Sequence, residues 1–515
     1  METIQKQRLS QAGPGTKGRI RSNPCFALFI LISVLCLYVF YTRIHPLYIH
    51  DLDDWLYVYH TRAGYPDITD WNPTKVLPEV LMPLVSYIGA YLIYPITGDY
   101  IQSLCNAYAV TLTLLIAVYL IFTARLLKKW FALDDITLTT VMVIFLLGHF
   151  LPFLTREENN QHLFYSINVT CVFNYLIPAL WNFLLCLWFL RAEKPYWKGS
   201  APKLGILIFL IYLAIFSSLW HSVILMSLFG MRLLVALIEG IAQNRREGRK
   251  AVSWPYLLGY AKENLPKLLA LLTWFAAMIL EVSGERAAYS SMDSFQLGTA
   301  VVVSIRFLLD MNPVFLASVI VINLAGLLIA LYRWKRKGEQ KILLRQLELV
   351  GCMVLCGVFV VLVGAKVGPN YLPRSDIMIS WMLWLMLITI VTLSWLVKLQ
   401  PKLMWFLPIL AFMLFCETVL HENSYANPYI YQQPPAVVKA VDDDIIAQIQ
   451  AADELGEAAA EVHIPVEGSD GWPLDMDLTP GRLSQALYRH GLTKRPIEVT
   501  LVPDPQKDVQ FQTRP

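Results

Sequence analysis

The chain has 515 residues, of which 56% are hydrophobic and 16% are charged, and its mean hydropathy is +0.50. This composition excludes an ordinary soluble globular protein, because apolar runs long enough to cross a bilayer recur between residues 25 and 420. The runs are continuous rather than alternating, so they predict helices and not a barrel. The net charge of +3 is small, and only its distribution is informative. We therefore predict an all-α polytopic membrane protein.

The N-terminal tail is expected to be cytoplasmic. Residues 1–24 carry several Lys and Arg side chains, and no small-residue cleavage site follows the first apolar run, Cys25–Tyr41. The chain then enters residues 44–103, which we interpret as one large first extracytoplasmic loop. The stretch 80–96 is apolar but contains prolines, and we expect it to lie along the membrane interface or dip into it rather than cross.

With that choice, the transmembrane region 25–420 is expected to contain about 11 spans. The connections richest in Lys and Arg then fall on the cytoplasmic side, and the C-terminus falls outside. After the first span, the expected spans are 104–124, 137–154, 169–191, 204–221, 223–241, 267–282, 313–333, 346–365, 376–397 and 402–420.

Residues 421–515 are polar and are expected to form a small extracytoplasmic α+β domain. The part that follows the linker at Pro428, Pro434 and Pro435 has about 80 residues, which is near the lower limit for a chain with its own core. The hydrophobic spacing and turn residues predict, in order, a helix at 436–461, a strand at 461–466, a turn at 468–473, a helix at 479–490 and a strand at 497–502.

Three carboxylates, Asp51, Asp53 and Asp54, directly follow the first span. Acidic groups held near lipid are costly, so such a cluster indicates a functional site. One carboxylate could accept a proton from an acceptor hydroxyl while another orients that hydroxyl or binds a cation. The alternative is that the acids cap a short helix and interact with its dipole.

Two basic groups at external span ends are candidates for binding a phosphate. Arg374 precedes a late span and could pair with a lipid-linked phosphate through its planar guanidinium, or it could simply anchor the interface. Arg156 and Glu157 lie in the most polar external loop of the bundle, which could bind phosphate or sugar or could be an ordinary solvated loop.

Asn174 and Tyr175 lie at the mouth of a span, where amides and aromatic rings could contact a sugar, although interfacial aromatic belts have the same composition. His221 lies between two apolar runs, where a histidine is more often hydrogen-bonded within the protein than a ligand. Arg286, near Glu281 and Glu285, is more simply interpreted as part of a local salt bridge.

Several classes of chemistry have no sequence support. The chain has no Gly-rich phosphate loop, no zinc-type histidine pair and no nucleophile elbow. All eight cysteines fall inside apolar runs or at their edges, so neither a disulfide framework nor a zinc site is expected. We expect no nucleotide chemistry on the cytosolic side and no nucleic-acid partner.

Short motifs at three places carry a resemblance. Asp53-Asp54-Trp55 follows the first span, Phe173-Asn174-Tyr175-Leu176-Ile177-Pro178 is an aromatic, Asn-Tyr and Pro motif, and Pro369 to Arg374 precede a late span. With the long first loop and the soluble C-terminal domain, the chain resembles the GT-C superfamily of integral-membrane glycosyltransferases, and within it a multi-pass bacterial family. The resemblance covers residues 25–400.

The resemblance implies an inverting transfer of a sugar from a polyprenyl-phosphate carrier to a glycan or lipid of the cell envelope, at the bacterial plasma membrane. A first-loop Asp would be the general base, and basic residues would hold the phosphate. The segment Trp71-Asn72-Pro73-Thr74-Lys75 stands where an Asn-Gly-Arg-like element is expected, with Lys75 in place of Arg. A divalent metal ion held by Asp51 and Asp53 is a further hypothesis.

Two other classes of function stay open from the sequence. A transporter or flippase of lipid-linked sugars should carry ionisable groups along a path in mid-span, whereas most charges here lie at span ends. A non-catalytic scaffold that presents residues 421–515 would not depend on the acidic cluster.

Overall fold

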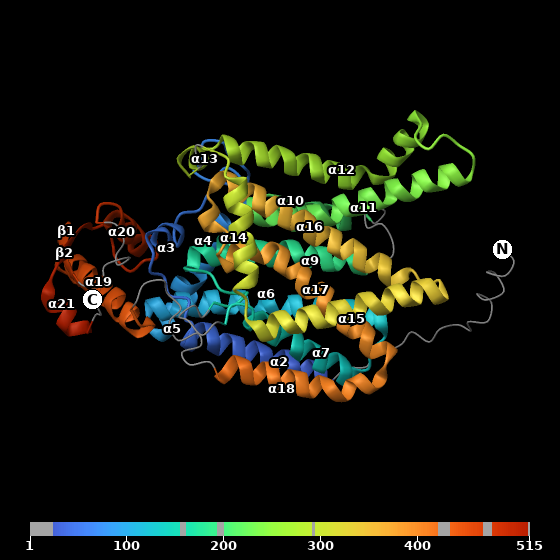
Figure 1. Ribbon diagram of the computed structural model, residues 1–515. Coiled ribbons are helices and arrows are strands. Elements are labelled where there is room, and N and C mark those ends of the chain that lie inside the picture. The colour runs from blue at the N-terminus through green and yellow to red at the C-terminus, as the bar shows by residue number, and fades with distance from the viewer. Residues whose placement is uncertain are drawn as a thin grey trace.

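The computed structural model describes residues 24–154, 161–192, 200–290, 294–420, 433–466 and 476–512. Long helices run side by side in a bundle, and the C-terminal elements gather at one end of it, beside the first loop (Figure 1). Ten helices of the described chain are long and apolar enough to cross a membrane. The expected all-α polytopic membrane protein is therefore confirmed.

The bundle helices, with their bounds, are α2 (Pro24–Val39, continued by the π-turn η1, Phe40–Ile44), α6 (Tyr100–Phe131), α7 (Asp135–Phe150), α9 (Ile177–Arg191), α10 (Ala201–Ile215), α11 (Leu219–Arg246), α12 (Trp254–Ser283), α15 (Pro313–Lys337), α16 (Lys341–Val367), α17 (Ser375–Leu399) and α18 (Leu407–Leu420). Each segment expected as a span overlaps one of these helices. Shorter elements join them: α3 (Leu52–Tyr57), α8 (Val169–Cys171), the π-turn η3 (Val172–Leu176), α13 (Glu285–Ser290), α14 (Leu297–Leu309) and the 3₁₀ turns η5 (Pro369–Tyr371) and η6 (Pro401–Phe406).

The count of spans differs from the expected number in two ways. Nine of the ten long apolar helices coincide with expected spans, and the tenth is the helical stretch Val76–Thr97, which the sequence interpretation placed in the first loop. The second difference is that two expected spans correspond to shorter helices. The span at 137–154 corresponds to α7, with 16 residues, and the span at 204–221 to α10, with 15 residues. Both are shorter than the roughly 20 residues that a helix needs to cross a bilayer.

The stretch Val76–Thr97 consists of α4 (Val76–Ile88), the π-turn η2 (Gly89–Ile93) and α5 (Tyr94–Thr97). Gly89 lies so close to α6 that a Cβ atom there would be 2.8 Å from the Leu104 side chain. The prolines do not prevent a helix: Pro83 lies inside α4, and Pro95 lies in the first turn of α5, where a missing N–H costs least.

By length and composition this stretch could cross a membrane, yet the chain enters and leaves it at the same end of the bundle. Tyr41, at the end of the first span, accepts a hydrogen bond from the Cys105 thiol near the start of α6, at 3.4 Å. Tyr38 on the same turn bonds Asn106, at 3.2 Å. The first span and α6 are therefore antiparallel neighbours, and residues 45–99 begin and end together.

Two central helices start at this end. The spans that contain α9 and α17 are the most enclosed of the ten, whereas α12, α15 and α18 leave most of their apolar side chains on the outer surface. α9 packs against α6 and α11, and α17 packs against α15 and α16. Residues that immediately precede α9 and α17 are therefore held by the best-packed part of the molecule.

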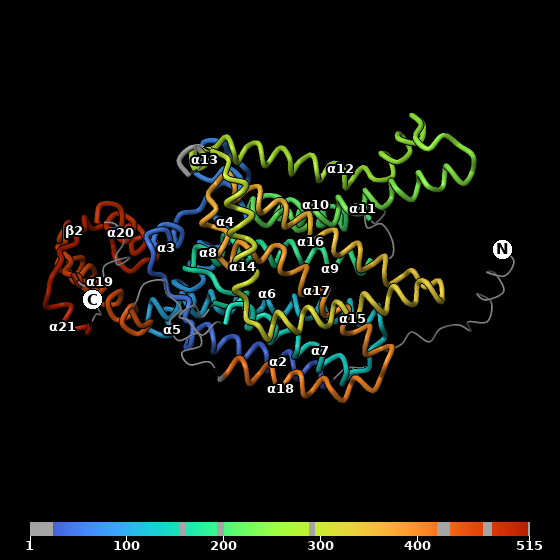
Figure 2. The backbone as a smooth tube through the Cα atoms, viewed as in Figure 1, coloured from blue at the N-terminus to red at the C-terminus, as the bar shows by residue number. Residues whose placement is uncertain are grey.

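The C-terminal elements are α19 (Pro435–Leu455), β1 (Ala459–Ile464), α20 (Thr479–Arg489), β2 (Glu498–Pro503) and α21 (Pro505–Phe511). The two strands pair in parallel, with Val462 opposite Leu501. A parallel pair needs a crossover, and α20 supplies it. These elements cluster beside α3 and α5, as the red end of the tube shows (Figure 2).

Cysteine labelling tests whether residues 76–97 cross the membrane. We expect Thr69→Cys and Thr97→Cys to react with a membrane-impermeant maleimide from one side, and Glu247→Cys from the other side. All three side chains are exposed, and the unmodified protein gives the background of its own cysteines. Labelling of Thr97→Cys only from the side of Glu247→Cys would show that the stretch crosses.

Candidate active site

The acidic cluster forms the start of α3. Asp51 is the N-cap, and its carboxylate accepts a hydrogen bond from the backbone N–H of Asp53 at 2.8 Å. Asp54 returns the contact by accepting from the backbone N–H of Asp51 at 3.3 Å. This capping box confirms the alternative that the acids cap a helix. It assigns a structural task to Asp51 and Asp54 and leaves the side chain of Asp53 outside the box.

Asp54 joins the first loop to the segment that precedes α9. Its carboxylate is fully buried and accepts hydrogen bonds from the backbone N–H and hydroxyl of Thr170, at 2.7 and 2.6 Å. A third bond comes from the backbone N–H of His50, at 3.1 Å. Burial raises the pKa of Asp54 to about 7, and these donors oppose the rise. Because both oxygens are occupied, Asp54 positions α3 rather than reaching a substrate.

Asp51 lies between Asp54 and the basic groups of the site. Burial raises the pKa of Asp51, the nearby charge of Asp53 adds to the rise, and a hydrogen bond with the Asn168 side chain opposes it. The Asn168 carbonyl oxygen in turn accepts from the backbone N–H of Cys171, at 2.7 Å. The Cys171 thiol contacts the guanidinium of Arg374, at 3.3 Å. A short chain of contacts therefore joins Asp51 to Arg374.

The hypothesis of a metal ion at Asp51 and Asp53 gains no support from the geometry. Within the described ranges, no three His, Cys, Asp or Glu side chains come together in a group that could hold a metal ion. Asp51 uses its carboxylate to cap α3, and the Asp53 side chain is 59% exposed beside Arg482 of the C-terminal domain, at 3.4 Å.

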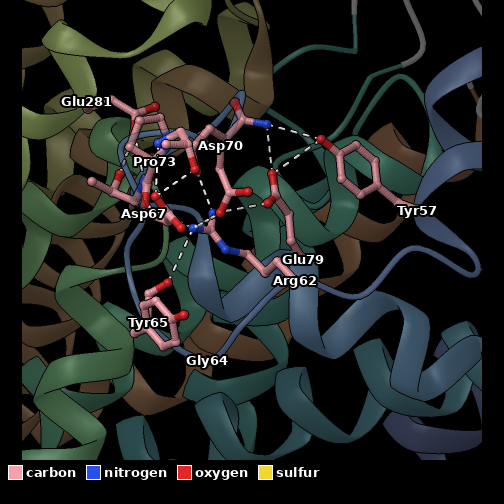
Figure 3. Close-up of polar contacts among 12 residues, drawn as sticks. Tyr57, Arg62, Gly64, Tyr65, Asp67, Asp70, Pro73, Glu79 and Glu281 are labelled. Atoms are coloured by element: carbon pink, nitrogen blue, oxygen red, sulfur yellow. Dashed lines mark hydrogen bonds and ion pairs between the residues drawn. The ribbon is translucent and has the colours of Figure 1, made fainter.

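Arg62 holds the loop between α3 and α4 in place (Figure 3). Its buried guanidinium pairs with Glu79 at 3.1 Å and with Asp70, and it donates to the carbonyl groups of Asn72 and Pro73. A buried cation requires such paired and hydrogen-bonded surroundings. The network fixes residues 72–75 against the start of α4.

The same network extends across the site. The Asn72 amide donates to Glu79 at 2.7 Å and to the Tyr57 hydroxyl at 3.1 Å, as Figure 3 shows for Tyr57 and Glu79. The Asn72 carbonyl oxygen accepts from the guanidinium of Arg286, at 2.7 Å. Glu281, at the end of α12, accepts from the backbone N–H and hydroxyl of Thr74. Segments far apart in sequence thus surround Lys75.

A cavity of about 290 Å³ lies beside this network. Side chains of both signs and two aromatic rings line it, among them Lys75, Tyr175, Glu281, Arg286, Lys366 and Tyr371. Lys75 is only 4% exposed, and no group in the described part of the chain accepts a hydrogen bond from its ammonium. Burial and the charge of Arg286 lower the pKa of Lys75 to about 8, so the side chain is still mainly protonated at neutral pH.

Three cations converge on Tyr175, which projects from η3. The Lys75 ammonium lies 5.5 Å from the ring centroid and the Arg374 guanidinium lies 5.2 Å from it. Arg286 donates to the Tyr175 hydroxyl at 3.4 Å. Arg374 is also paired with Asp376, at 2.8 Å. An aromatic ring stabilises a cation that stacks on its face, and the N–H groups of that cation can still donate hydrogen bonds to another group.

The structure thus brings together Asp51, Asp53, Asp54, Lys75, Tyr175 and Arg374, all singled out in the sequence. Asn174 is buried but does not line the cavity. Both ring nitrogens of His221 are bonded within the protein, to Ser218 and to the carbonyl of Asp376. His221 is therefore the satisfied histidine of the alternative interpretation. Arg156 and Glu157 lie outside the described residues.

Arg62 and Glu79 were not singled out in the sequence, Asn72 was named only within the segment 71–75, and Arg286 was undervalued. The side chains that they bond lie from 7 to 214 residues away, so no regular spacing marks them. Arg286 was interpreted as part of a local salt bridge, but its guanidinium also donates to the side chains of Asn72 and Tyr175. The one available signal was that these polar residues border apolar runs.

The chain was compared with protein families, curated proteins and solved structures. No protein-family model, no curated protein and no solved structure matches the chain. Function is therefore argued from the site alone.

Substitution of Thr170 tests the link between α3 and the start of α9. Thr170→Val keeps the shape of the side chain but removes the hydroxyl donor to the buried Asp54, so we expect a loss of about 1.5–3 kcal/mol in the free energy of unfolding. Thr170→Ser keeps the donor and should lose less. Denaturation of the purified proteins in detergent provides the measurement, and equal stability of Thr170→Val and the parent would contradict the assignment.

Proposed function

We propose that the protein is a bacterial plasma-membrane glycosyltransferase that moves a sugar from a polyprenyl-phosphate carrier to a glycan or lipid of the cell envelope, on the extracytoplasmic side. The observation that carries the proposal is the buried Lys75 ammonium, without a hydrogen-bond acceptor in the described chain, in a cavity shared with Arg286. A buried cation without an acceptor is costly. An anionic substrate group would supply the missing acceptor.

A phosphate suits this cavity better than a carboxylate. Lys75 and Arg286 line the cavity, and Arg374 stacks on the Tyr175 ring that lines it as well. Guanidinium groups bind phosphate oxygens in pairs, and an ammonium adds a point charge. The cavity lies where α4, η3 and α12 meet at one end of the bundle, so a carrier whose polyprenyl chain stays in the bilayer could present its phosphate there.

The acids at the same end supply the other half of a transfer reaction. Asp51 accepts the proton of the acceptor hydroxyl as the acceptor oxygen bonds to the anomeric carbon. The bond from that carbon to the carrier phosphate oxygen breaks, and the negative charge develops on the phosphate. Lys75, Arg286 and Arg374 stabilise that charge. Direct displacement inverts the anomeric centre.

Asp51 is the base in this scheme for two reasons. Its contacts through Asn168 and Cys171 lead to Arg374, whereas Asp54 is occupied by Thr170. A general base works best when its pKa approaches the working pH, and burial raises the pKa of Asp51 in that direction. Activity should therefore fall on the acid side at a higher pH than for an ordinary carboxylate.

Asn substitutions of the three acids test the mechanism. We expect Asp51→Asn to lower the turnover number by about 10²- to 10⁴-fold, the range for loss of a general base. Asp53→Asn should retain more activity, and Asp54→Asn should lower stability together with activity. The assay is transfer or slow hydrolysis of radiolabelled sugar from a panel of synthetic polyprenyl-phosphate sugars.

Two outcomes would contradict this proposal. Full activity of Asp51→Asn would remove the general base assigned here. No turnover of any donor by the parent, with binding of the lipid phosphate retained, would favour a flippase of lipid-linked sugars.

The pH dependence of anion binding tests Lys75. Farnesyl methyl phosphate carries one negative charge throughout the useful pH range, so any change in its affinity reports the protein. The pKa of Lys75 lies at about 8, so the ammonium is present below that pH and lost above it. We expect affinity to fall as the pH rises through 8, measured by calorimetry in detergent.

Lys75→Gln should bind this phosphodiester roughly 10- to 100-fold more weakly at pH 7, the worth of a charged hydrogen bond. It should also lose the fall in affinity around pH 8. Lys366→Gln is the matched control, because Lys366 lines the same cavity but is exposed. An equal loss in both variants would mean that the cavity attracts anions only through its general charge.

A further inference from the structure

The C-terminal domain contacts both ends of α3, the short helix that carries the acids. Arg482, on α20, donates to the backbone carbonyl of Leu52 at 2.9 Å and lies 3.4 Å from the Asp53 carboxylate. His490, directly after α20, contacts the carbonyl of Val58 at 3.1 Å. Leu52 begins α3, and Val58 is its C-cap. One helix of the C-terminal domain therefore holds both ends of α3.

The contact at His490 is specific and enclosed. The ring is 2% exposed, its Nδ1 atom lies 2.6 Å from the Tyr100 hydroxyl, and it packs edge-on against Tyr87. Burial lowers the pKa of His490 to about 4, so the ring is neutral at pH 7. The carbonyl of Val58 can only accept, so Nε2 donates to it and Nδ1 accepts from Tyr100.

Further contacts tie the domain to the same end of the bundle. The Tyr91 hydroxyl donates to the carbonyl of Arg489 at 2.7 Å, and Lys439 pairs with Asp99 at 2.8 Å. Asp442 on α19 lies 4.0 Å from the His50 ring, and both residues are buried. The domain is thus seated on residues 50–100 and not merely tethered to the last span.

α3 needs such support because it has only six residues. An isolated helix of that length does not persist in water, since the cost of nucleation exceeds the gain from so few hydrogen bonds. The capping box fixes its first turn, and Asp54 fixes its inner side. Among the described residues outside the first loop, only Arg482 and His490 hydrogen-bond the carbonyl groups of Leu52 and Val58.

We propose that the C-terminal domain is part of the catalytic unit, with Arg482 as a positioning residue that holds α3 and orients its acids toward the acceptor. The role in turnover rests on the proposed glycosyl transfer, whereas the clamp on α3 does not. Arg482 touches no reacting atom in this scheme. It acts through the main chain of Leu52 and through the charge that it places beside Asp51 and Asp53.

Hydrogen exchange of the full-length protein in detergent tests the clamp without any substrate. In Arg482→Gln, we expect the backbone amides of residues 53–58 to exchange about tenfold faster, because α3 loses a charged hydrogen bond. Peptides from α20 and β2 should be unchanged, which shows that the domain is still folded. Arg495→Gln is the control, because Arg495 donates to the backbone carbonyl of Glu457 within the domain. Unchanged exchange at 53–58 in Arg482→Gln would overturn the proposal.

A pH profile then separates positioning from mere stabilisation. Asp53, Asp54 and Arg482 are charged neighbours of Asp51, and Arg482 opposes the burial-driven rise in the pKa of Asp51. Arg482→Gln should therefore lower the turnover number and move the acid limb of the profile to higher pH, and Arg482→Lys should restore the limb. A profile that keeps its position in Arg482→Gln would overturn the positioning role. Failure of the parent to transfer any sugar, with the exchange result intact, would refute the glycosyl transfer and leave the clamp standing.

Discussion

The pairing of Asp54 with Thr170 is the contact on which the site depends. It fixes the first loop to residues 168–176, the segment that leads into the central helix α9. The same segment supplies Asn168 to Asp51 and Cys171 to Arg374, and it presents Tyr175 to the basic groups of the cavity. Because α9 is among the most enclosed helices, the acids and the cations are held on a common rigid support, which the proposed transfer between two bound substrates would require.

Charge is distributed unevenly around that support. Arg62 is neutralised by Glu79 and Asp70, and Arg374 by Asp376. Lys75 lacks such a pairing in the described chain, although Glu281 and Glu79 act on it from a distance. Arg62 and Arg374 are both paired, so the ammonium of Lys75 stands out as a buried cation whose acceptor must come from elsewhere. In our account, the substrate phosphate completes the site and gains the interaction energy on binding.

Hydropathy predicted the bundle, because burial in lipid demands long apolar helices wherever they occur. It did not predict that Val76–Thr97 is one continuous helical stretch with a π-turn inside it, and its expected place along the membrane interface stays a prediction. In the site, Asp51 and Arg374 were found because acids and cations at span ends are conspicuous. Arg62 and Glu79 were not, since their pairing is formed only by the fold. The cavity could not be predicted from the sequence, because its lining residues range from Lys75 to Tyr371.

The most direct test of the central claim is the position of a bound lipid phosphate. A cryo-electron-microscopy structure of the full-length protein in nanodiscs, with a polyprenyl phosphodiester added, would show it. Our account predicts phosphate density in the cavity between Lys75, Arg286 and Arg374, with Asp51 on the acceptor side, opposite the departing phosphate. Phosphate bound elsewhere, with this cavity filled only by solvent, would contradict the account.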